Sequence, residues 1–128
     1  MNFDQTIAAI SSAPGVGAIA IVRLSGVRAV EIIKSIFRGN GESSTGVEQK
    51  SHQAKHGFIL DGNDVIDEVV VTFFASPNSY TGEDIIEISC HGNPLIARHI
   101  LSLCLKEGAR LAEPGEFTRR LFFLEKLI

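Results

Sequence analysis

Residues 77–94 read Pro77-Asn-Ser-Tyr-Thr-Gly-Glu-Asp-Ile-Ile-Glu-Ile-Ser-Cys-His-Gly-Asn-Pro94 and form the most informative stretch of the chain. A turn-rich cluster leads into an apolar run, which Glu87 interrupts and a His-Gly-Asn-Pro sequence ends. Strand side chains alternate between two faces, which predicts one apolar face holding Ile86, Ile88 and Cys90. The opposite face holds Ile85 and three polar residues in register, Glu87, Ser89 and His91. A strand that only packs rarely has such a face, so we expect a functional site here.

The pattern of apolar residues around this strand predicts a mixture of strands and helices. Further strands are expected at 6–11, 17–24, 56–60, 67–74 and 109–112, and helices at 27–37, at 94–106 and from about 116. The sequence Asp61-Gly-Asn-Asp64 is typical of a hairpin turn, whereas 39–51 has the composition of a loop. Because strands and helices do not alternate regularly, we predict an α+β fold: a mixed, mostly antiparallel sheet with two to three helices.

Length and charge limit the classes of protein that fit. The chain has 128 residues, which corresponds to one domain. Its net charge of −3 argues against broad contact with a phosphate backbone, although a small anion site remains compatible. The first residues lack a basic segment before an apolar one, and the longest apolar run, Ala18–Val22, is too short to cross a bilayer. We therefore expect a cytoplasmic protein with no membrane partner, whose Cys90 and Cys104 are buried free thiols.

Two kinds of site are not supported by the motifs. The sequence Ala13-Pro-Gly-Val-Gly17 resembles part of a phosphate loop, but a strand follows it, so a Gly-rich turn between paired strands is the better interpretation. No Gly-x-x-x-x-Gly-Lys-Ser/Thr motif occurs, and we expect no GTP hydrolysis by this chain. A metal site is not expected either, because the histidine and cysteine spacings of His91 with Cys90, His99 with Cys104, and His52 with His56 do not suit ligation.

Arg23 and Glu87 are the candidate site residues, because each is a charge within an otherwise apolar strand. A partly buried guanidinium or carboxylate needs a partner. The two residues therefore either form a structural ion pair with one another or hold a polar ligand, since arginine and carboxylate groups support paired hydrogen bonds. His91 is a further candidate hydrogen-bonding residue on the same face.

Three separated blocks resemble the N-terminal domain of the bacterial tRNA-modification GTPase family MnmE/TrmE. They are Thr6–Gly26, the Ser79-Tyr-Thr-Gly-Glu-Asp84 segment with its His-Gly-x-Pro ending, and Gly108–Arg120 with its Glu-Pro-Gly-Glu-Phe-Thr core. The resemblance implies an aminomethyltransferase-like folate-binding fold. It implies that residues 1–120 form a tetrahydrofolate-binding and dimerisation domain. Residues 121–128 would begin the segment that leads to a helical and GTP-binding region outside this chain.

The resemblance also implies a ligand site at three positions. Arg23, Glu87 and Lys126 match the family's folate-binding residues, and no catalytic residue is carried over. The expected cofactor is a tetrahydrofolate derivative, formyl- or methylene-tetrahydrofolate, whose pterin edge offers two N–H donors to Glu87. Around Lys126 the chain departs from the family pattern at Leu124, Glu125 and Ile128. GTP, magnesium and potassium belong to the missing domain.

The function that follows is the N-terminal module of a GTPase that modifies the wobble uridine of tRNA. The full-length protein would act as a homodimer, with a flavin-dependent partner protein and tRNA, and folate would supply the one-carbon unit. This makes the chain a fragment of a GTP hydrolase without a GTPase motif of its own. Two alternatives are a stand-alone folate-dependent one-carbon transferase and a structural dimerisation domain whose folate site has decayed.

The last residues of the chain raise a separate expectation. Six of the final eight residues are apolar, namely Leu121, Phe122, Phe123, Leu124, Leu127 and Ile128. A free terminus is normally polar, so this tail should pack on this domain, on a second copy or on a missing region. Arg120 matches a fixed arginine of the family and is expected to pair with Glu116 one helical turn earlier, whereas Arg119 should be solvated.

Overall fold

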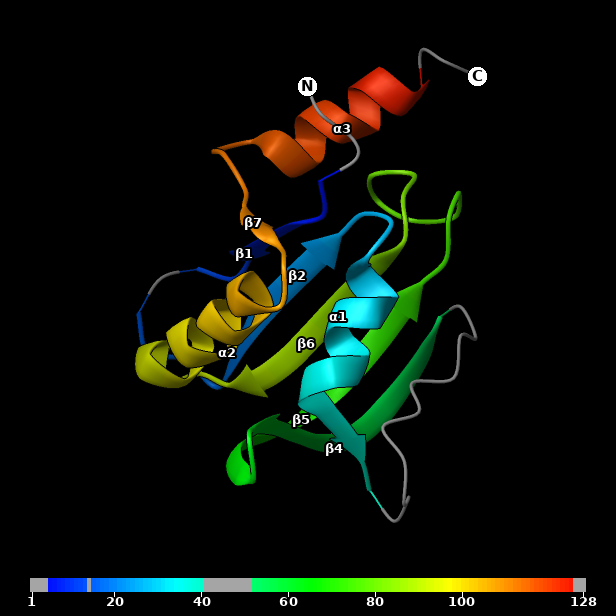
Figure 1. Cartoon of the computed structure of the whole chain (residues 1–128). Helices are drawn as coiled ribbons and strands as arrows, with labels where there is room; N and C mark the ends of the chain where they lie inside the picture. Colours follow the sequence, from blue (N-terminus) through cyan, green and yellow to red (C-terminus); the bar gives the residue numbers. More distant parts are fainter. Residues whose placement is uncertain (1–4, 14, 41–51, 126–128) are drawn as a thin grey trace.

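The computed structural model describes residues 5–13, 15–40 and 52–125 (Figure 1). Its elements are, in chain order, β1 (Ile7–Ile10), β2 (Ile19–Ser25), α1 (Ala29–Ile36), β3 (Phe37–Gly39), β4 (Gln53–Asp61), β5 (Asp64–Phe74), β6 (Ile85–His91), α2 (Pro94–Lys106), β7 (Arg110–Leu111) and α3 (Glu116–Glu125). No helix in this described part of the chain is long and apolar enough to cross a membrane.

The strands form one sheet in the order β3-β4-β5-β6-β2-β1-β7. Every neighbouring pair is antiparallel except β1 with β7, which runs parallel because the chain passes through α2 before it reaches β7. Together with three helices, this mixed and mostly antiparallel sheet confirms the predicted α+β fold.

The core lies between the sheet and the two helices α1 and α2, which cover the same face (Figure 1). From β2 and β6, every second side chain points into this core: Ala20, Val22, Leu24, Ile86, Ile88 and Cys90. The predicted apolar face of the β6 strand is thus confirmed, and Glu87, Ser89 and His91 lie on the opposite face, which α1 and α2 leave open. Ile85 shares this open face but is buried at its edge.

The turns follow the expected backbone chemistry. Asp61 pairs with Asp64 across the β4–β5 hairpin, where Gly62 has a φ of +61°, a left-handed conformation that glycine adopts without strain. Helix α2 begins with Pro94 in its first turn, and the Asn93 side chain caps it by accepting a hydrogen bond from the Leu95 amide at 2.8 Å. The predicted hairpin and the predicted start of this helix are therefore confirmed.

One strand was not predicted. The helix expected over 27–37 ends at Ile36, and the chain continues directly into the short edge strand β3, whose Phe37 is fully buried. Phe37 lies over Gly57, where an added Cβ would be only 2.5 Å from a ring carbon. The hydrophobic period of the helix runs into Phe37 without a break, so only this tertiary contact with β4 distinguishes strand from helix there.

Candidate functional site

Arg23 and Glu87 lie directly opposite each other on β2 and β6, on the face that α1 and α2 leave open. The Arg23 Nε and Nη2 atoms donate hydrogen bonds to Glu87 Oε2 at 3.0 and 2.8 Å. The side chains are 23% and 22% exposed, so the pair is partly desolvated but within reach of a ligand. The two residues that the sequence singled out are therefore brought together by strand register.

The Glu87 carboxylate has spare hydrogen-bonding capacity. Both arginine bonds fall on Oε2, and among the described residues no other group bonds to Glu87. An ionised carboxylate accepts about four hydrogen bonds over its two oxygens. Arg23 therefore fixes the orientation of the carboxylate while Oε1 stays available to a donor from a ligand.

Short side chains flank the charged pair along the sheet. Ala9 on β1 is opposite Arg23, and Thr72 on β5 is opposite Glu87. Ala54 on β4 continues this row beside Thr72. In this row, Ala9, Arg23, Glu87, Thr72 and Ala54, only Arg23 and Glu87 have long charged side chains on the open face of the sheet.

Two aromatic rings lie over Arg23. The guanidinium carbon is 5.6 Å from the Tyr80 ring centroid and 5.4 Å from that of Phe117, distances that suit cation–π contact. Tyr80 comes from the turn-rich segment before β6, and Phe117 from the first turn of α3. The Tyr80 hydroxyl also shares a hydrogen bond with Thr118 Oγ1 at 2.9 Å. Sequence reasoning missed both rings, although Tyr80 lies within the motif quoted above.

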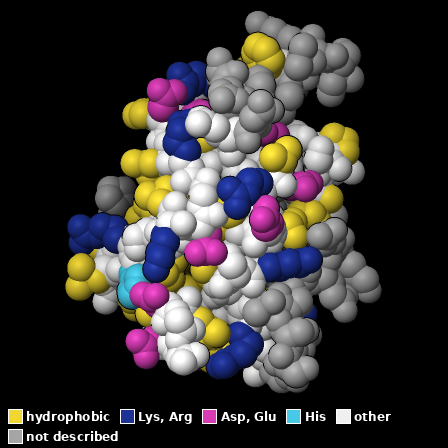
Figure 2. Space-filling view, in the orientation of Figure 1, with side chains coloured by type: hydrophobic (Ala, Val, Ile, Leu, Met, Phe, Trp, Pro, Cys, Tyr) yellow, Lys and Arg dark blue, Asp and Glu magenta, His cyan; other side chains and the backbone are white. Residues whose placement is uncertain are grey.

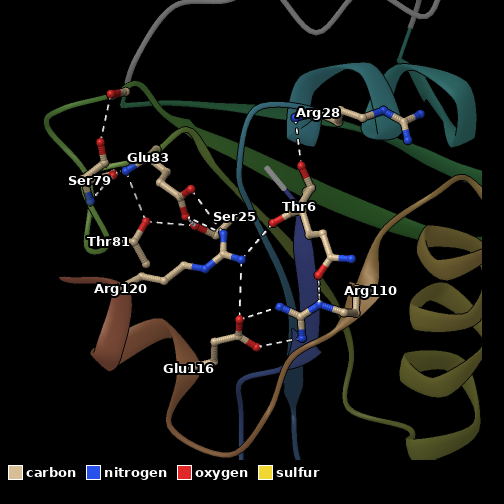
Figure 3. A network of polar contacts seen from close by, with 12 residues as sticks. Thr6, Ser25, Arg28, Ser79, Thr81, Glu83, Arg110, Glu116 and Arg120 are labelled. Carbon is tan, nitrogen blue, oxygen red and sulfur yellow. Dashed lines mark hydrogen bonds and ion pairs between the residues drawn. The ribbon is translucent and has the colours of Figure 1, made fainter. Parts of the chain in front are cut away.

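A buried polar network fixes α3 beside this site (Figure 3). The Arg120 side chain is fully buried, and its Nη1 donates to both Glu83 oxygens at 2.8 and 3.2 Å. Its Nη2 donates to the Gln5 carbonyl at 2.8 Å and to Glu116 Oε2 at 3.4 Å. The expected pairing of Arg120 with Glu116 is confirmed, and its role in joining α3 to the segment before β6 could not be read from the sequence.

Glu116 connects the same network to β7. Arg110 donates to its two oxygens at 3.0 and 2.5 Å, and the Glu113 amide donates to Oε1 at 2.9 Å. The hydrogen bonds from Arg110 hold the pKa of Glu116 at about 2, well below its usual value of 4.5. The same contact raises the pKa of Arg110. Glu116 is therefore ionised at neutral pH, and it anchors the start of α3.

Two hydroxyl groups, of Ser25 and Thr81, connect the buried polar network to β2. Ser25, two residues beyond Arg23, lies 2.8 Å from the Thr81 hydroxyl and donates to Glu83 Oε1 at 3.0 Å (Figure 3). Ser25 and Thr81 are both fully buried. Glu83 thus receives bonds from β2 and α3 together, which holds Tyr80 and Phe117 above the Arg23–Glu87 pair.

The remaining candidates lie elsewhere or have other partners. Lys126 falls outside the described residues, and Arg119 is exposed and paired with Glu113. Three histidines are paired with carboxylates on other parts of the sheet and on α2: His91 with Asp67, His56 with Glu68, and His99 with Asp61. Over residues 5–13, 15–40 and 52–125, no group of three or more His, Cys, Asp or Glu side chains could hold a metal ion.

Both cysteines are buried and free, as predicted. Burial raises the pKa of the Cys90 thiol to about 11 and that of Cys104 to about 12. Neither sulfur is therefore a thiolate at neutral pH, and neither belongs to the site at Glu87.

The turn between β1 and β2 connects two antiparallel strands, which confirms the interpretation of Ala13–Gly17 as a turn rather than a phosphate loop. The Ser12 hydroxyl accepts a hydrogen bond from the Ile21 amide at 3.0 Å and holds the turn against β2. A cavity of about 460 Å³ lies between this turn and α2, and its walls are mainly apolar. In Figure 2, acidic and basic side chains are interspersed over the face in view, without a continuous basic stripe among the described residues.

Fold and site together define an α+β domain with an oriented arginine–carboxylate pair on the open face of its sheet. The chain belongs to the family described as GTP-binding protein TrmE N-terminus, which matches residues 6–126.

Curated relatives agree with this assignment. The chain is 47% identical over 129 residues to the tRNA modification GTPase MnmE of Endomicrobium trichonymphae, covering 99% of this chain and 27% of the relative. It is 48% identical to the protein of that name from Thermotoga maritima over 96% of this chain and 26% of the relative. The protein from Thermoanaerobacter sp. (strain X514) is 53% identical, over 95% of this chain and 26% of its own length. The chain thus spans about a quarter of the curated relatives it matches.

Proposed function

We propose that this chain is the tetrahydrofolate-binding and dimerisation module of a GTPase that modifies the wobble uridine of tRNA. Family membership and relatives named tRNA modification GTPase support the cellular role. Because those relatives are about four times as long as this chain, GTP hydrolysis is assigned to the part that the chain does not include. In that whole protein, GTP, magnesium and potassium would bind the GTPase domain.

The observation that carries the ligand proposal is the arrangement at Glu87. Its carboxylate is oriented by two bonds from Arg23, and nothing else in the described chain bonds to it. The edge of a pterin presents adjacent N–H donors, which match a carboxylate as a guanidinium does. Glu87 would accept the pterin donors mainly through Oε1, and Arg23 would hold Glu87 or a ligand carbonyl. Lys126 is the third proposed ligand contact, and only its match to the family pattern supports it.

A bound formyl- or methylene-tetrahydrofolate supplies a one-carbon unit, and this chain's part is to bind and orient the ligand. No residue at the site acts as a catalytic acid or base in this proposal. The reaction on tRNA requires a flavin-dependent partner protein together with the full-length GTPase, which fits a cytoplasmic setting. Residues 1–120 would form the folate and dimerisation domain, with 121–128 leading into the next region, so that α3 spans this boundary.

We propose homodimerisation because the family resemblance implies it. Exposed apolar side chains could form the interface. Several large apolar side chains of the described chain are exposed, including Ile19, Leu95, Phe122 and Phe123. Phe122 is 59% exposed, so α3 does not bury the predicted apolar tail completely within this domain. A second copy or a following domain can therefore cover it.

A second candidate is a structural domain whose folate site has decayed. The observation that favours it is that Arg23 and Glu87 already satisfy one another by two hydrogen bonds. In that case the ion pair would stabilise the fold and would have no role in ligand binding. The departures from the family pattern around Lys126 would then reflect the loss of ligand contacts.

Calorimetric titration with formyl-tetrahydrofolate separates these two candidates. The proposed function predicts saturable binding to the wild-type chain, weakened by Arg23→Ala and Glu87→Gln and less by Lys126→Ala. Loss of one partner of a hydrogen-bonded charge pair in a dry site costs about 2–5 kcal/mol. The absence of binding to the wild-type chain would instead favour the structural candidate.

A further inference from the structure

We propose that Tyr80 and Phe117 form an aromatic wall of the ligand site at Arg23 and Glu87, and that this wall binds the flat ring system of the ligand. The inference rests on the proposed function, because it takes the ligand to be a reduced folate. It adds two uncharged residues, from two separate segments of the chain, to the proposed ligand contacts.

The rings of Tyr80 and Phe117 lie close to the charged pair. Both centroids lie 5.4 to 5.6 Å from the Arg23 guanidinium carbon, and the nitrogens of that group bond to Glu87 at 2.8 and 3.0 Å. We infer that a flat heterocycle whose amino edge reaches Glu87 lies beside the same two rings, because Arg23 contacts both the rings and Glu87. Heterocycles stack favourably on aromatic side chains whatever their detailed pattern of donors.

Tyr80 lies at the surface. Its side chain is 47% exposed, and its ring covers a charged pair at the surface instead of filling the core. A cation–π contact at such a site is weak, and fixing a side chain costs conformational entropy. Stability alone therefore explains the placement of this ring poorly, whereas a wall for a planar ligand explains it directly.

Hydrogen bonds hold the aromatic wall in place. The Tyr80 hydroxyl bonds to Thr118, next to Phe117 on α3, at 2.9 Å. Arg120 on α3 also joins Glu83, from the same segment as Tyr80, at 2.8 Å. The two segments that carry the rings are thus linked to each other above the sheet, which preorganises the wall before a ligand arrives.

Tyr80 also provides a direct readout, because it is the only tyrosine of the chain. A chain labelled with fluorotyrosine therefore gives a single fluorine NMR resonance. Addition of formyl-tetrahydrofolate should shift this resonance. A reduced pterin without the benzoylglutamate portion should shift it too, whereas p-aminobenzoylglutamate alone should not.

Affinity measured by calorimetry on unlabelled variants completes the test. Tyr80→Leu and Phe117→Leu keep apolar volume but remove a ring, and each should weaken folate binding about five- to tenfold. Tyr80→Phe and Thr118→Val break one hydrogen bond between the segments but keep both rings. Because the contact of Arg120 with Glu83 still joins the segments, the affinity of these two variants should stay within about twofold of wild type. Val65→Ala, a change at an exposed apolar position on β5, serves as the control.

The outcomes distinguish this inference from the proposed function. Folate binding with an unmoved fluorine resonance and an unchanged affinity for Tyr80→Leu would overturn the aromatic wall and leave the Arg23–Glu87 site standing. No heat of binding for the wild-type chain would overturn the proposed function and the wall with it. Phe117 is partly buried, so the exposed Tyr80 decides the result if Phe117→Leu does not fold.

Discussion

Arg120 donates hydrogen bonds to both oxygens of Glu83, at 2.8 and 3.2 Å, although the two residues are 37 positions apart in the sequence. The contact joins α3 to the segment that precedes β6, and the arginine side chain is fully buried. A buried charge requires a charged partner or several hydrogen bonds, and here Glu83, Glu116 and the Gln5 carbonyl supply them. The position of α3 above the candidate site depends on this contact.

Replacement of Arg120 should therefore be costly. Arg120→Met removes the cation that pairs with Glu83 and leaves Glu116 with Arg110 as its arginine partner, and we expect the free energy of unfolding to fall by about 3–5 kcal/mol. Arg119→Ala is the matched control on the same helix, because Arg119 and its partner Glu113 are exposed. It should change the free energy of unfolding by less than about 1 kcal/mol. Urea denaturation of both variants measures the difference, and equal stability would show that Arg120 does not hold α3.

The Glu116 carboxylate predicts a dependence of stability on pH. Its pKa is about 2 in the folded chain, because Arg110 bonds to it, compared with 4.5 for an ordinary glutamate. The folded-state pKa is lowered, so the stabilisation is fully present above about pH 5 and is lost as pH falls towards 2. The shift corresponds to about 3 kcal/mol. Glu116→Gln should be less stable at neutral pH and should lose less stability on acidification. If the stability of Glu116→Gln fell with decreasing pH as steeply as that of the wild-type chain, Glu116 would not be the source of the pH dependence.

The two cysteines should be inert in the folded chain. Burial holds the pKa of Cys90 at about 11 and of Cys104 at about 12, so that neither forms a thiolate at about pH 8. Alkylation with iodoacetamide should be slow in buffer and should modify both thiols rapidly in denaturant. Fast labelling of the native chain, with its secondary structure intact by circular dichroism, would contradict the burial of these residues.

We expect the chain to be a homodimer at micromolar concentration. A stable interface of this kind typically buries about 2,000 Å² or more and is rich in apolar residues. Sedimentation equilibrium over a range of concentrations measures the mass directly. A monomer at high micromolar concentration would contradict the dimerisation role while leaving the ligand site open to separate test.

Much of this fold could be predicted because local signals agree with the tertiary structure. The alternation around Glu87, the Asp61–Asp64 turn and Pro94 each identify their element from a few neighbouring residues. The exception is Phe37, where the helical pattern continues but contact with Gly57 draws the chain into β3. A short edge strand of this kind depends on its neighbour strand and leaves little trace in its own sequence.

Only the charged pair of the candidate site could be predicted from local signals in the sequence. Arg23 and Glu87 are conspicuous because each places a charge in an apolar strand, and register then pairs them. Tyr80 and Phe117 carry no such signal, since aromatic residues are common in turns and helices that pack. Their meeting above Arg23 depends on the placement of α3 by Arg120, a long-range contact that spacing along the sequence does not reveal.

The affinity of Glu87→Gln for formyl-tetrahydrofolate, measured by calorimetry beside its free energy of unfolding, tests the central claim most directly. The substitution keeps the shape of the side chain but replaces one acceptor oxygen with a donor. If Glu87 accepts the ligand's N–H groups, affinity should fall about tenfold or more, equivalent to about 1.4 kcal/mol. The free energy of unfolding should fall by only about 1 kcal/mol, since the pair with Arg23 is partly exposed. Equal affinity of the wild-type chain and Glu87→Gln would contradict the account and leave Glu87 as a structural partner of Arg23.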